Sequence, residues 1–303
     1  MTNSIEISGL CKSYGDFALD HIDLTLPGGS IMGLIGENGA GKTTTIKCIL
    51  NLIRRDAGTI TLMGYDNIAQ ERQAKAEVGV VLDECYFHDT LRPTDIHTIL
   101  SRVYENWDKA LFASCLKKFQ LPESKYVKEF SRGMKMKLSL AAALAHHPKL
   151  LILDEATAGL DPVVRDEILD EFLNFIQDEE HSILISSHIL SELSALATHY
   201  GFIEKGKVLE TISGADLREK CRECLELTVD DAPRAARVLE QQLGTRDYEV
   251  LPGNQLRVYA FLDDPQTVNR TLLEQGVGLI STQQKDSNLE DYFLNLIGGR
   301  HHG

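Results

Sequence analysis

The chain has 303 residues, of which 43% are hydrophobic, a composition that suits one large domain or a large domain followed by a small one. Its formal net charge of −14 argues against broad binding to nucleic acid or anionic lipid, so no nucleic-acid partner is expected. No apolar run approaches the roughly 18 residues that span a bilayer. The start, MTNSIEIS, lacks the basic and apolar regions of a signal peptide, which predicts a cytoplasmic location.

The chain up to about residue 212 predicts a mixed sheet with helices. Period-two alternation first indicates an antiparallel portion, with strands at 4–10, 18–26 and 58–63. Short apolar runs then alternate with long helical patterns, which indicates a mostly parallel sheet covered by helices. The runs are 78–82, 150–153 and 182–185, and the helices lie near 93–104, 131–146 and 163–178. A helix-rich segment, 84–130, is inserted between two of these strands.

The pattern changes after about residue 213, where the elements follow the β-α-β-β-α-β order of a ferredoxin-like domain. They are strand 225–230, helix 232–243, strands 247–251 and 255–260, helix 265–275 and strand 277–282, with a last helix at 288–297. Asp231 and Asp264 predict helix starts, because each is an acidic cap close before a proline. The sequence thus predicts an α/β domain at 1–212 and a small α+β domain at 213–303.

The segment GENGAGKT, residues 36–43, fits the phosphate-loop pattern G-x-x-x-x-G-K-[ST]. The apolar run before it predicts a strand, and Thr43–Leu52 predicts a helix. Such a loop presents backbone N–H groups to a phosphate at a helix N-terminus. Lys42 would reach the β- and γ-phosphates, and the Thr43 hydroxyl would ligate Mg²⁺. The predicted nucleotide-binding residues here are Gly36, Asn38, Gly39, Ala40, Gly41, Lys42, Thr43 and Thr44.

The segment LLILDEA, residues 150–156, places Asp154 and Glu155 directly after four apolar residues. A buried parallel strand that ends in two carboxylates would deliver them beside the phosphate loop. Asp154 suits a Mg²⁺ ligand, and Glu155 suits orienting or deprotonating the attacking water. A phosphate loop alone leaves kinases, GTPases, helicases and ATPases open, but this pair narrows the choice.

Further motifs complete a resemblance to the nucleotide-binding subunit of an ABC transporter, over roughly residues 3–212. Ser131-Arg132-Gly133-Met134 is similar to the family's signature sequence, and Ser131 stands where a helix N-cap belongs. AGLD at 158–161 resembles the loop after the catalytic strand, and ISSHIL at 185–190 resembles the switch segment. Tyr14 resembles the aromatic residue that stacks on adenine.

The resemblance implies an ATPase that uses ATP and Mg²⁺, with two cassettes paired head to tail. The signature helix of one cassette would point its N-terminus at the γ-phosphate held by the other, with Ser131 Oγ and Gly133 N–H as donors. Asp161, in the loop that resembles AGLD, is expected to contact nucleotide. His188 would position the attacking water with Glu155, and Lys42 is the third catalytic residue expected.

The implied partner is a transmembrane permease subunit, which would hold the chain at the inner face of the cell membrane and couple ATP hydrolysis to transport. The insert 84–130, beginning with Tyr86, Phe87 and His88, is expected to dock on it. The closing segment SNLEDYFLNLIG, residues 287–298, resembles the tail of exporter-type members with one cassette per chain. Whether the second cassette is identical remains open at this point.

Two positions depart from the family pattern. Asp83 stands where the family usually places a glutamine that ligates Mg²⁺, and we hypothesise that Asp83 also serves the metal; the alternative is an aspartate in a solvated loop. Arg132 stands where the signature usually has glycine, and it would either stabilise the partner-bound phosphate or point to solvent.

Three other functions are alternatives to this interpretation. A soluble ABC-type ATPase acting on ribosomes or DNA usually carries two cassettes or a long coiled coil, and this chain has neither. A phosphate-loop kinase or GTPase lacks the signature, the AGLD loop and the switch histidine. A ligand-sensing or dimerising role for residues 213–303 is compatible with the transporter ATPase.

Overall fold

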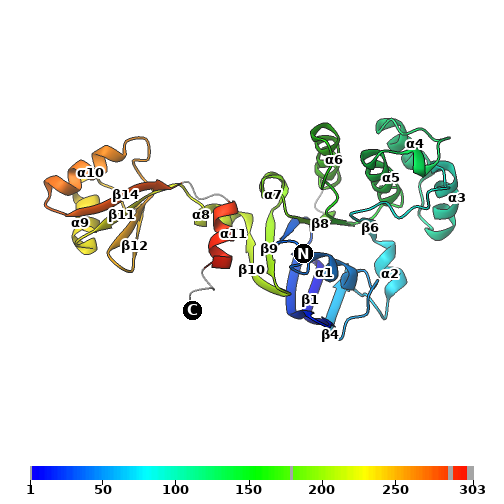
Figure 1. Cartoon of the computed structure of the whole chain (residues 1–303), viewed down its shortest axis with the longest axis horizontal. Helices are drawn as coiled ribbons and strands as arrows, with labels where there is room; N and C mark the ends of the chain where they lie inside the picture. The colour runs from blue at the N-terminus through cyan, green and yellow to red at the C-terminus, as the bar shows by residue number, and fades with distance from the viewer. Residues whose placement is uncertain (1, 178–179, 286–288, 299–303) are drawn as a thin grey trace. The chain divides into compact units, whose positions relative to one another are not determined.

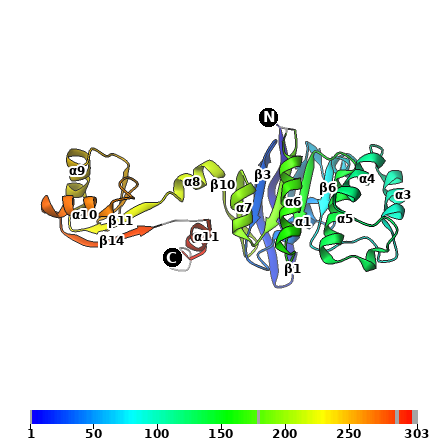
Figure 2. The ribbon, with the colours of Figure 1, turned by 90° about the horizontal axis from the view of Figure 1, so that it is seen from above.

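The computed structural model describes residues 2–177, 180–285 and 289–298. Residues 287 and 288 of the closing segment lie outside that part of the chain. The chain divides into two compact units, Met1–Gly214 and Ala215–Gly303. Figures 1 and 2 show their ribbons in two views.

Unit 1 begins with an antiparallel sheet whose strand order is β2-β1-β4-β5. The strands are β1 (Asn3–Tyr14), β2 (Phe17–Pro27), β4 (Ala57–Leu62) and β5 (Tyr65–Asp66). Its apolar residues alternate with exposed ones, so Ile5, Ile7 and Ile60 lie in the core while the other face is polar. The predicted antiparallel portion is confirmed.

The second sheet of unit 1 has the order β10-β9-β3-β8-β7-β6. The strands are β3 (Ile31–Ile35), β6 (Val78–Val81), β7 (Leu150–Asp154), β8 (Ser182–Ser187), β9 (His199–Glu204) and β10 (Lys207–Ser213). The strands β9, β3, β8, β7 and β6 are parallel to their neighbours, and β10 runs antiparallel to β9. Strands β3, β7 and β8 are buried at every residue, which explains their continuous apolar runs.

Helices cover the parallel sheet and form the predicted insert. They are α1 (Lys42–Ile49), α2 (Glu71–Ala76), α3 (Pro93–Val103), α4 (Lys109–Lys118), the 3₁₀ turn Val127–Glu129, α5 (Arg132–Leu144), α6 (Pro162–Phe175) and α7 (Leu190–Leu196). Helices α3, α4 and α5 lie together at one end of unit 1 (Figure 1). Ser131 caps α5 as expected, because its Oγ accepts a hydrogen bond from Met134 N at 3.2 Å.

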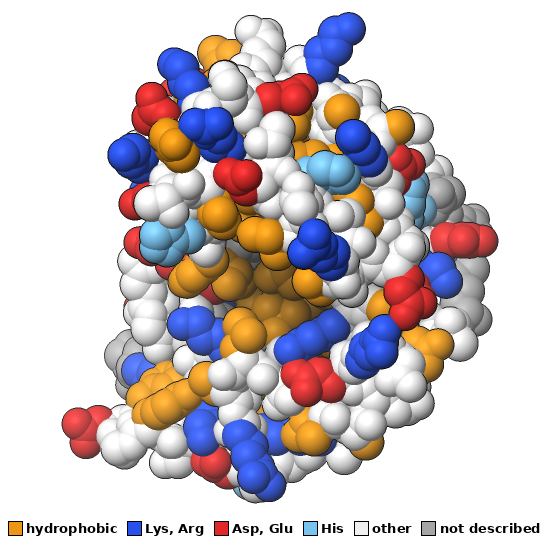
Figure 3. Space-filling model, turned by 90° about the vertical axis from the view of Figure 1, so that its right-hand side faces the viewer, with side chains coloured by type: hydrophobic (Ala, Val, Ile, Leu, Met, Phe, Trp, Pro, Cys, Tyr) orange, Lys and Arg blue, Asp and Glu red, His pale blue; other side chains and the backbone are white. Residues whose placement is uncertain are grey.

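A hollow of about 600 Å³ opens between the β6 end, α3 and α5. Apolar side chains dominate its lining: Leu52, Val80, Leu82, Tyr86, Phe87, Leu100, Tyr104, Ala142 and Ala143. Figure 3 shows this face of the molecule, with hydrophobic side chains inside the hollow and Lys and Arg side chains around it. The Tyr86 side chain lies at its edge and is 68% exposed. We name this hollow the α3–α5 groove.

Unit 2 is a four-stranded antiparallel sheet with the order β12-β13-β11-β14, preceded by α8 (Gly214–Lys220). In chain order its elements are β11 (Cys224–Val229), α9 (Ala232–Gln242), β12 (Tyr248–Leu251), β13 (Gln255–Val258), α10 (Pro265–Glu274), β14 (Leu279–Lys285) and α11 (Leu289–Gly298). Asp231 and Asp264 cap α9 and α10 as the sequence predicts. Leu225, Leu227 and Leu256 form its core with the inner faces of both helices.

Among the described residues, no helix is long and apolar enough to cross a membrane.

Candidate functional site

Many of the predicted site residues of unit 1 lie at the carboxyl ends of four neighbouring parallel strands. The phosphate loop follows β3, Asp83 follows β6, Asp154 ends β7, and His188 follows β8. Because parallel strands end at the same edge of a sheet, segments that are far apart in the sequence meet there. This edge is where ligands bind in open α/β sheets.

The backbone of the phosphate loop requires glycine at three positions. Gly39 and Gly41 have φ angles of +82° and +117°, in the region that favours glycine. A Cβ atom on Gly36 would lie 2.4 Å from the carbonyl oxygen of Ile203 on β9. The chain therefore passes close to β9 and turns directly into α1, which leaves the N-terminus of α1 facing the loop.

Lys42, the first residue of α1, is almost fully buried under the loop. Its Nζ donates hydrogen bonds to the carbonyl oxygens of Gly36 at 2.7 Å and Glu37 at 3.1 Å. The loop thus holds the ammonium group in place, where it can donate hydrogen bonds to a bound phosphate.

Glu155 lies between Lys42 and His188. Its Oε1 is 3.4 Å from Lys42 Nζ, and its Oε2 is 3.1 Å from His188 Nδ1. Glu155 has a φ angle of +50°, unusual for a residue with a side chain and typical of strained functional positions. The turn after β7 therefore directs this carboxylate toward the loop rather than along the strand.

Asp154 is buried and is held by Ser186 on the neighbouring strand β8. Ser186 Oγ donates to Asp154 Oδ1 at 2.6 Å and accepts from Glu155 N at 3.1 Å. Burial raises the pKa of Asp154, hydrogen bonds from Ser186 and Thr43 lower it, and the negative charges of Asp83 and Glu155 raise it. The sequence interpretation missed Ser186, although ISSHIL contains it two residues before His188.

A cavity of about 370 Å³ lies over the phosphate loop. Its lining residues are Phe17, Asn38, Gly39, Gly41, Lys42, Thr43, Thr44 and Glu155. Phe17 was not predicted; the only signal for it was its position three residues after Tyr14, across the β1–β2 turn. Tyr14 is 46% exposed, with Lys12 Nζ 5.2 Å from the ring centroid.

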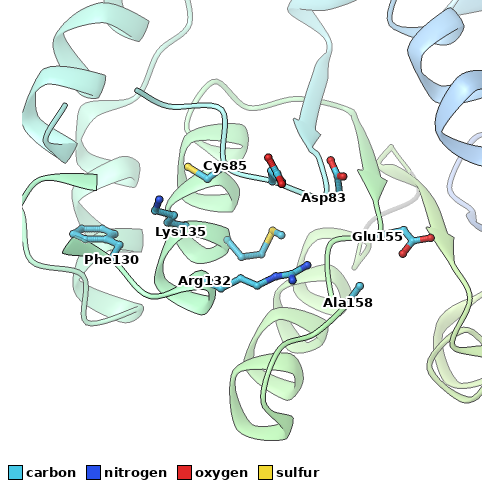
Figure 4. Close-up of a pocket in the computed structure, with 9 residues that line it drawn as sticks. Asp83, Cys85, Phe130, Arg132, Lys135, Glu155 and Ala158 are labelled. Carbon is cyan, nitrogen blue, oxygen red and sulfur yellow. The ribbon is translucent and has the colours of Figure 1, made fainter. Parts of the chain in front are cut away.

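Arg132 of the signature sequence lines a different cavity, of about 540 Å³, which shares Glu155 with the first. Arg132 extends from the start of α5 toward the loop that carries Ala158 (Figure 4), and its guanidinium group lies against Gly159. Asp83 and Lys135 also line this cavity. Among the described residues that line the phosphate-loop cavity, none comes from α5.

Two further predicted residues have local structural roles. Asp161 caps α6, because its Oδ1 accepts from Val164 N at 3.1 Å. Gly133 packs against the same Val164, where a Cβ atom would come within 3.0 Å of Cγ1. The chain thus brings together the loop, Asp83, Asp154, Glu155 and His188, and leaves Ser131, Gly133 and Asp161 on the surface beside α5 and α6.

Known proteins resemble this chain over nearly its whole length. A family model described as ABC transporter matches residues 19–158. The chain is 35% identical to the bacitracin transport ATP-binding protein BcrA of Bacillus licheniformis, over 99% of both chains. It is 30% identical to the daunorubicin/doxorubicin resistance ATP-binding protein DrrA of Streptomyces peucetius, over 98% of this chain and 93% of the other.

Solved structures show the same cassette fold. An ATP-binding subunit of an ABC transporter superposes with a TM-score of 0.64 at 25% identity, over 71% of this chain and 92% of that one. A dimeric ATP-binding cassette with ADP and Pi bound gives 0.62 at 17% identity, over 69% of this chain and 98% of that one. The chain therefore belongs to the ATP-binding subunits of ABC transporters, which are ATPases.

Proposed function

We propose that this chain hydrolyses ATP with Mg²⁺ in a composite site shared by two cassettes, and so drives export through a permease at the inner face of the membrane. The observation that carries the proposal is the position of Glu155, held between Lys42 and His188 beside the phosphate loop. This arrangement supplies a base, a cation and a switch group side by side.

The phosphate-loop cavity suits a nucleoside triphosphate. Lys42 donates hydrogen bonds to two carbonyl oxygens of the loop. When a nucleotide binds, its ammonium group can donate to phosphate oxygens instead. The N–H groups at the start of α1 add donors and a favourable dipole. Glu155 would accept the proton of the attacking water, and His188 would hold that water and the γ-phosphate in place. Tyr14 and Phe17 would hold the adenine.

The Mg²⁺ site would be formed by Thr43, Asp154 and Asp83. These side chains supply oxygen ligands, the chemistry that Mg²⁺ prefers. Burial and the neighbouring negative charges raise the pKa of Asp154, so a cation there would relieve an existing electrostatic cost. The metal would neutralise charge on the phosphates, while Ser186 keeps Asp154 oriented.

The second cassette would complete the site with its own signature helix. Ser131 and Gly133 lie on the surface, apart from the phosphate loop of their own chain, which is where a contact to another chain's nucleotide requires them. The free N–H groups at the start of α5 would meet the γ-phosphate. Arg132 would add positive charge there.

The α3–α5 groove would receive an apolar helix of the permease. Its lining is mostly hydrophobic, and α3, which borders the groove, carries two more exposed apolar residues, Ile99 and Val103. The position of Asp83 and Tyr86 on one segment would connect the groove to the metal site. Export is favoured by the relatives named for bacitracin transport and for daunorubicin/doxorubicin resistance.

The proposed pairing can be tested with the purified Glu155→Gln variant, whose mass is measured in solution with and without MgATP. Loss of the base should slow hydrolysis by roughly 10²–10⁴-fold and spare ATP binding. We expect a shift from monomer to dimer that depends on ATP and disappears when Lys42→Ala or Ser131→Arg is added. Clear ATP binding by a persistent monomer would mean that the partner is a non-identical cassette or that pairing needs the permease.

Unit 2 would regulate the cassette or help it to pair. A truncated chain that ends at residue 212 should then hydrolyse ATP at a different rate from the full chain. An unchanged rate would leave unit 2 a scaffolding role only.

A further inference from the structure

A thiol, a carboxylate and an imidazole converge on the antiparallel sheet of unit 1, outside the nucleotide site. Cys11 belongs to β1, and Asp20 and His21 belong to β2. One ligand atom from each residue lies within 4.8 Å of the other two. We name this group the β1–β2 cluster. None of its members lines the phosphate-loop cavity or the signature cavity.

An irregularity in the strand pairing creates the cluster. Leu10 pairs with Ile22 and Lys12 pairs with Leu19, so Cys11 faces two residues of β2 instead of one. His21 adopts a φ angle of +49°, the conformation of a bulge residue. Successive side chains of a regular strand point to opposite faces, whereas this extra residue lets Asp20 and His21 reach the same thiol.

We propose that Cys11, Asp20 and His21 bind a divalent cation of the zinc type. Thiolate, imidazole and carboxylate are the donors that zinc uses in proteins, and three of them with one open position form a complete site when water is the fourth ligand. The sulfur ligand discriminates against Mg²⁺, which prefers oxygen. This site is separate from the proposed Mg²⁺ site and does not depend on it.

The charges around the cluster allow a cation to enter. Asp20 Oδ1 lies 2.6 Å from His21 Nδ1, whereas its Oδ2 lies 3.0 Å from Lys207 Nζ. Asp20 can therefore bind a metal through one oxygen and keep Lys207 on the other. The remaining nearby cations are also paired, Lys12 with Asp56 at 2.9 Å and Lys205 with Glu204 at 3.2 Å.

Access and protonation also fit a binding site. The His21 side chain is 77% exposed and Cys11 is partly exposed, so a hydrated ion can reach both. Binding would replace the hydrogen bond between Asp20 and His21 with a metal bond from each. The thiol of Cys11 would release its proton to solvent, and the His21 ring would remain neutral with its proton on Nε2.

The test is a titration of the full-length, metal-free protein with Co²⁺, followed by competition with Zn²⁺. Co²⁺ bound to a thiolate gives a charge-transfer band in the near ultraviolet, which Co²⁺ at an oxygen-only site does not give. We expect this band in the native protein, its loss in Cys11→Ser, and at least tenfold weaker Zn²⁺ binding in His21→Gln. The control is Cys221→Ser, which alters a partly exposed thiol of unit 2 and should leave the band unchanged.

The proposal is overturned if no thiolate band develops at millimolar Co²⁺, or if the band survives in Cys11→Ser. It is also overturned if Cys221→Ser abolishes the band. Should Cys11→Ser fail to fold, His21→Gln and Asp20→Asn decide the question, because both side chains are substantially exposed. Unchanged Zn²⁺ affinity in both of these variants would exclude the cluster as the site.

Discussion

His188 Nδ1 lies 3.1 Å from Glu155 Oε2, although the two residues follow different strands, β8 and β7. The other oxygen of the same carboxylate faces Lys42 at 3.4 Å. Glu155 is therefore fixed from both sides, and its left-handed backbone conformation leaves it little freedom to adjust. Removing His188 should disturb the base more than it disturbs nucleotide binding, whereas Lys42 serves both.

The His188→Ala variant should lose about 10²-fold or more in kcat, because one of the groups that position Glu155 and the water is gone. KM for ATP should change little, since the phosphate loop stays intact. Steady-state phosphate release measures both constants. His147→Ala is the matched control, because His147 is also exposed and paired with a carboxylate, Asp108, but lies away from the site. Equal losses in the two variants would contradict the role given to His188.

The Ser186→Ala variant should lower both stability and activity, because Asp154 would lose its hydrogen bond in a buried position. The expected cost is about 1–3 kcal/mol in the free energy of unfolding, measured with urea. The Mg²⁺ concentration for half-maximal hydrolysis should also rise. Ser182→Ala, at the opposite end of β8, also removes a buried hydroxyl and should lower stability alone. If Ser186→Ala and Ser182→Ala need the same Mg²⁺ concentration for half-maximal hydrolysis, Ser186 has no role in orienting the metal ligand Asp154.

Motif spacing predicted which segments meet at the sheet edge, because a strand that precedes a phosphate loop and a strand that ends in two carboxylates leave little geometric freedom. Glu155 and His188 meet as the shared sheet edge requires. Ser186 and Phe17 were missed for a physical reason: a serine in an apolar strand and a phenylalanine after a turn are common, and only the three-dimensional pairing gives them a role.

The elements at the end of unit 1 were harder to predict than those at its start. Strands β9 and β10 were not anticipated, since HYGFIEKGKVLETIS mixes apolar and charged residues without clear alternation. Their hairpin is determined by tertiary contacts: β9 pairs with β3, and Gly206 approaches Ala18 of β2 closely. The β1–β2 cluster was likewise invisible, because it depends on a register shift that residue patterns do not encode.

The Asp83→Asn variant should raise the Mg²⁺ concentration needed for half-maximal ATP hydrolysis, because it removes a charged oxygen ligand from the proposed Mg²⁺ site. The titration of activity against Mg²⁺ at saturating ATP measures this. Glu84→Gln changes the next residue in the same way and should have a smaller effect, since Glu84 is not one of the proposed Mg²⁺ ligands. If the Mg²⁺ dependence is unchanged in Asp83→Asn, Asp83 does not bind the metal and is a residue of a solvated loop.

The buried thiols Cys48 and Cys115 should resist alkylation in the native protein. Burial raises the pKa of each to about 11, so only about a thousandth of either is thiolate at pH 8. Cys85, which is partly exposed, should react at least tenfold faster with iodoacetamide. Peptide mass spectrometry over time follows each site separately, and unfolding in urea should abolish the difference. Fast native labelling of Cys48 would mean that the packing around α1 opens readily.

A charge in the α3–α5 groove should weaken binding of the permease without changing the chemistry of the site. Leu100→Asp places a carboxylate among the apolar lining, where a docked helix would have to desolvate it. Leu173→Asp is the matched control, because Leu173 is an exposed leucine on α6 that does not line the groove. Basal ATPase activity of the isolated chains should stay near the native value in both variants.

Co-purification with the permease should fall at least tenfold in Leu100→Asp alone, since a desolvated carboxylate costs about 1.4 kcal/mol or more, which is a factor of ten in affinity. Retention of the complex by Leu100→Asp would show that the permease docks on another face of unit 1.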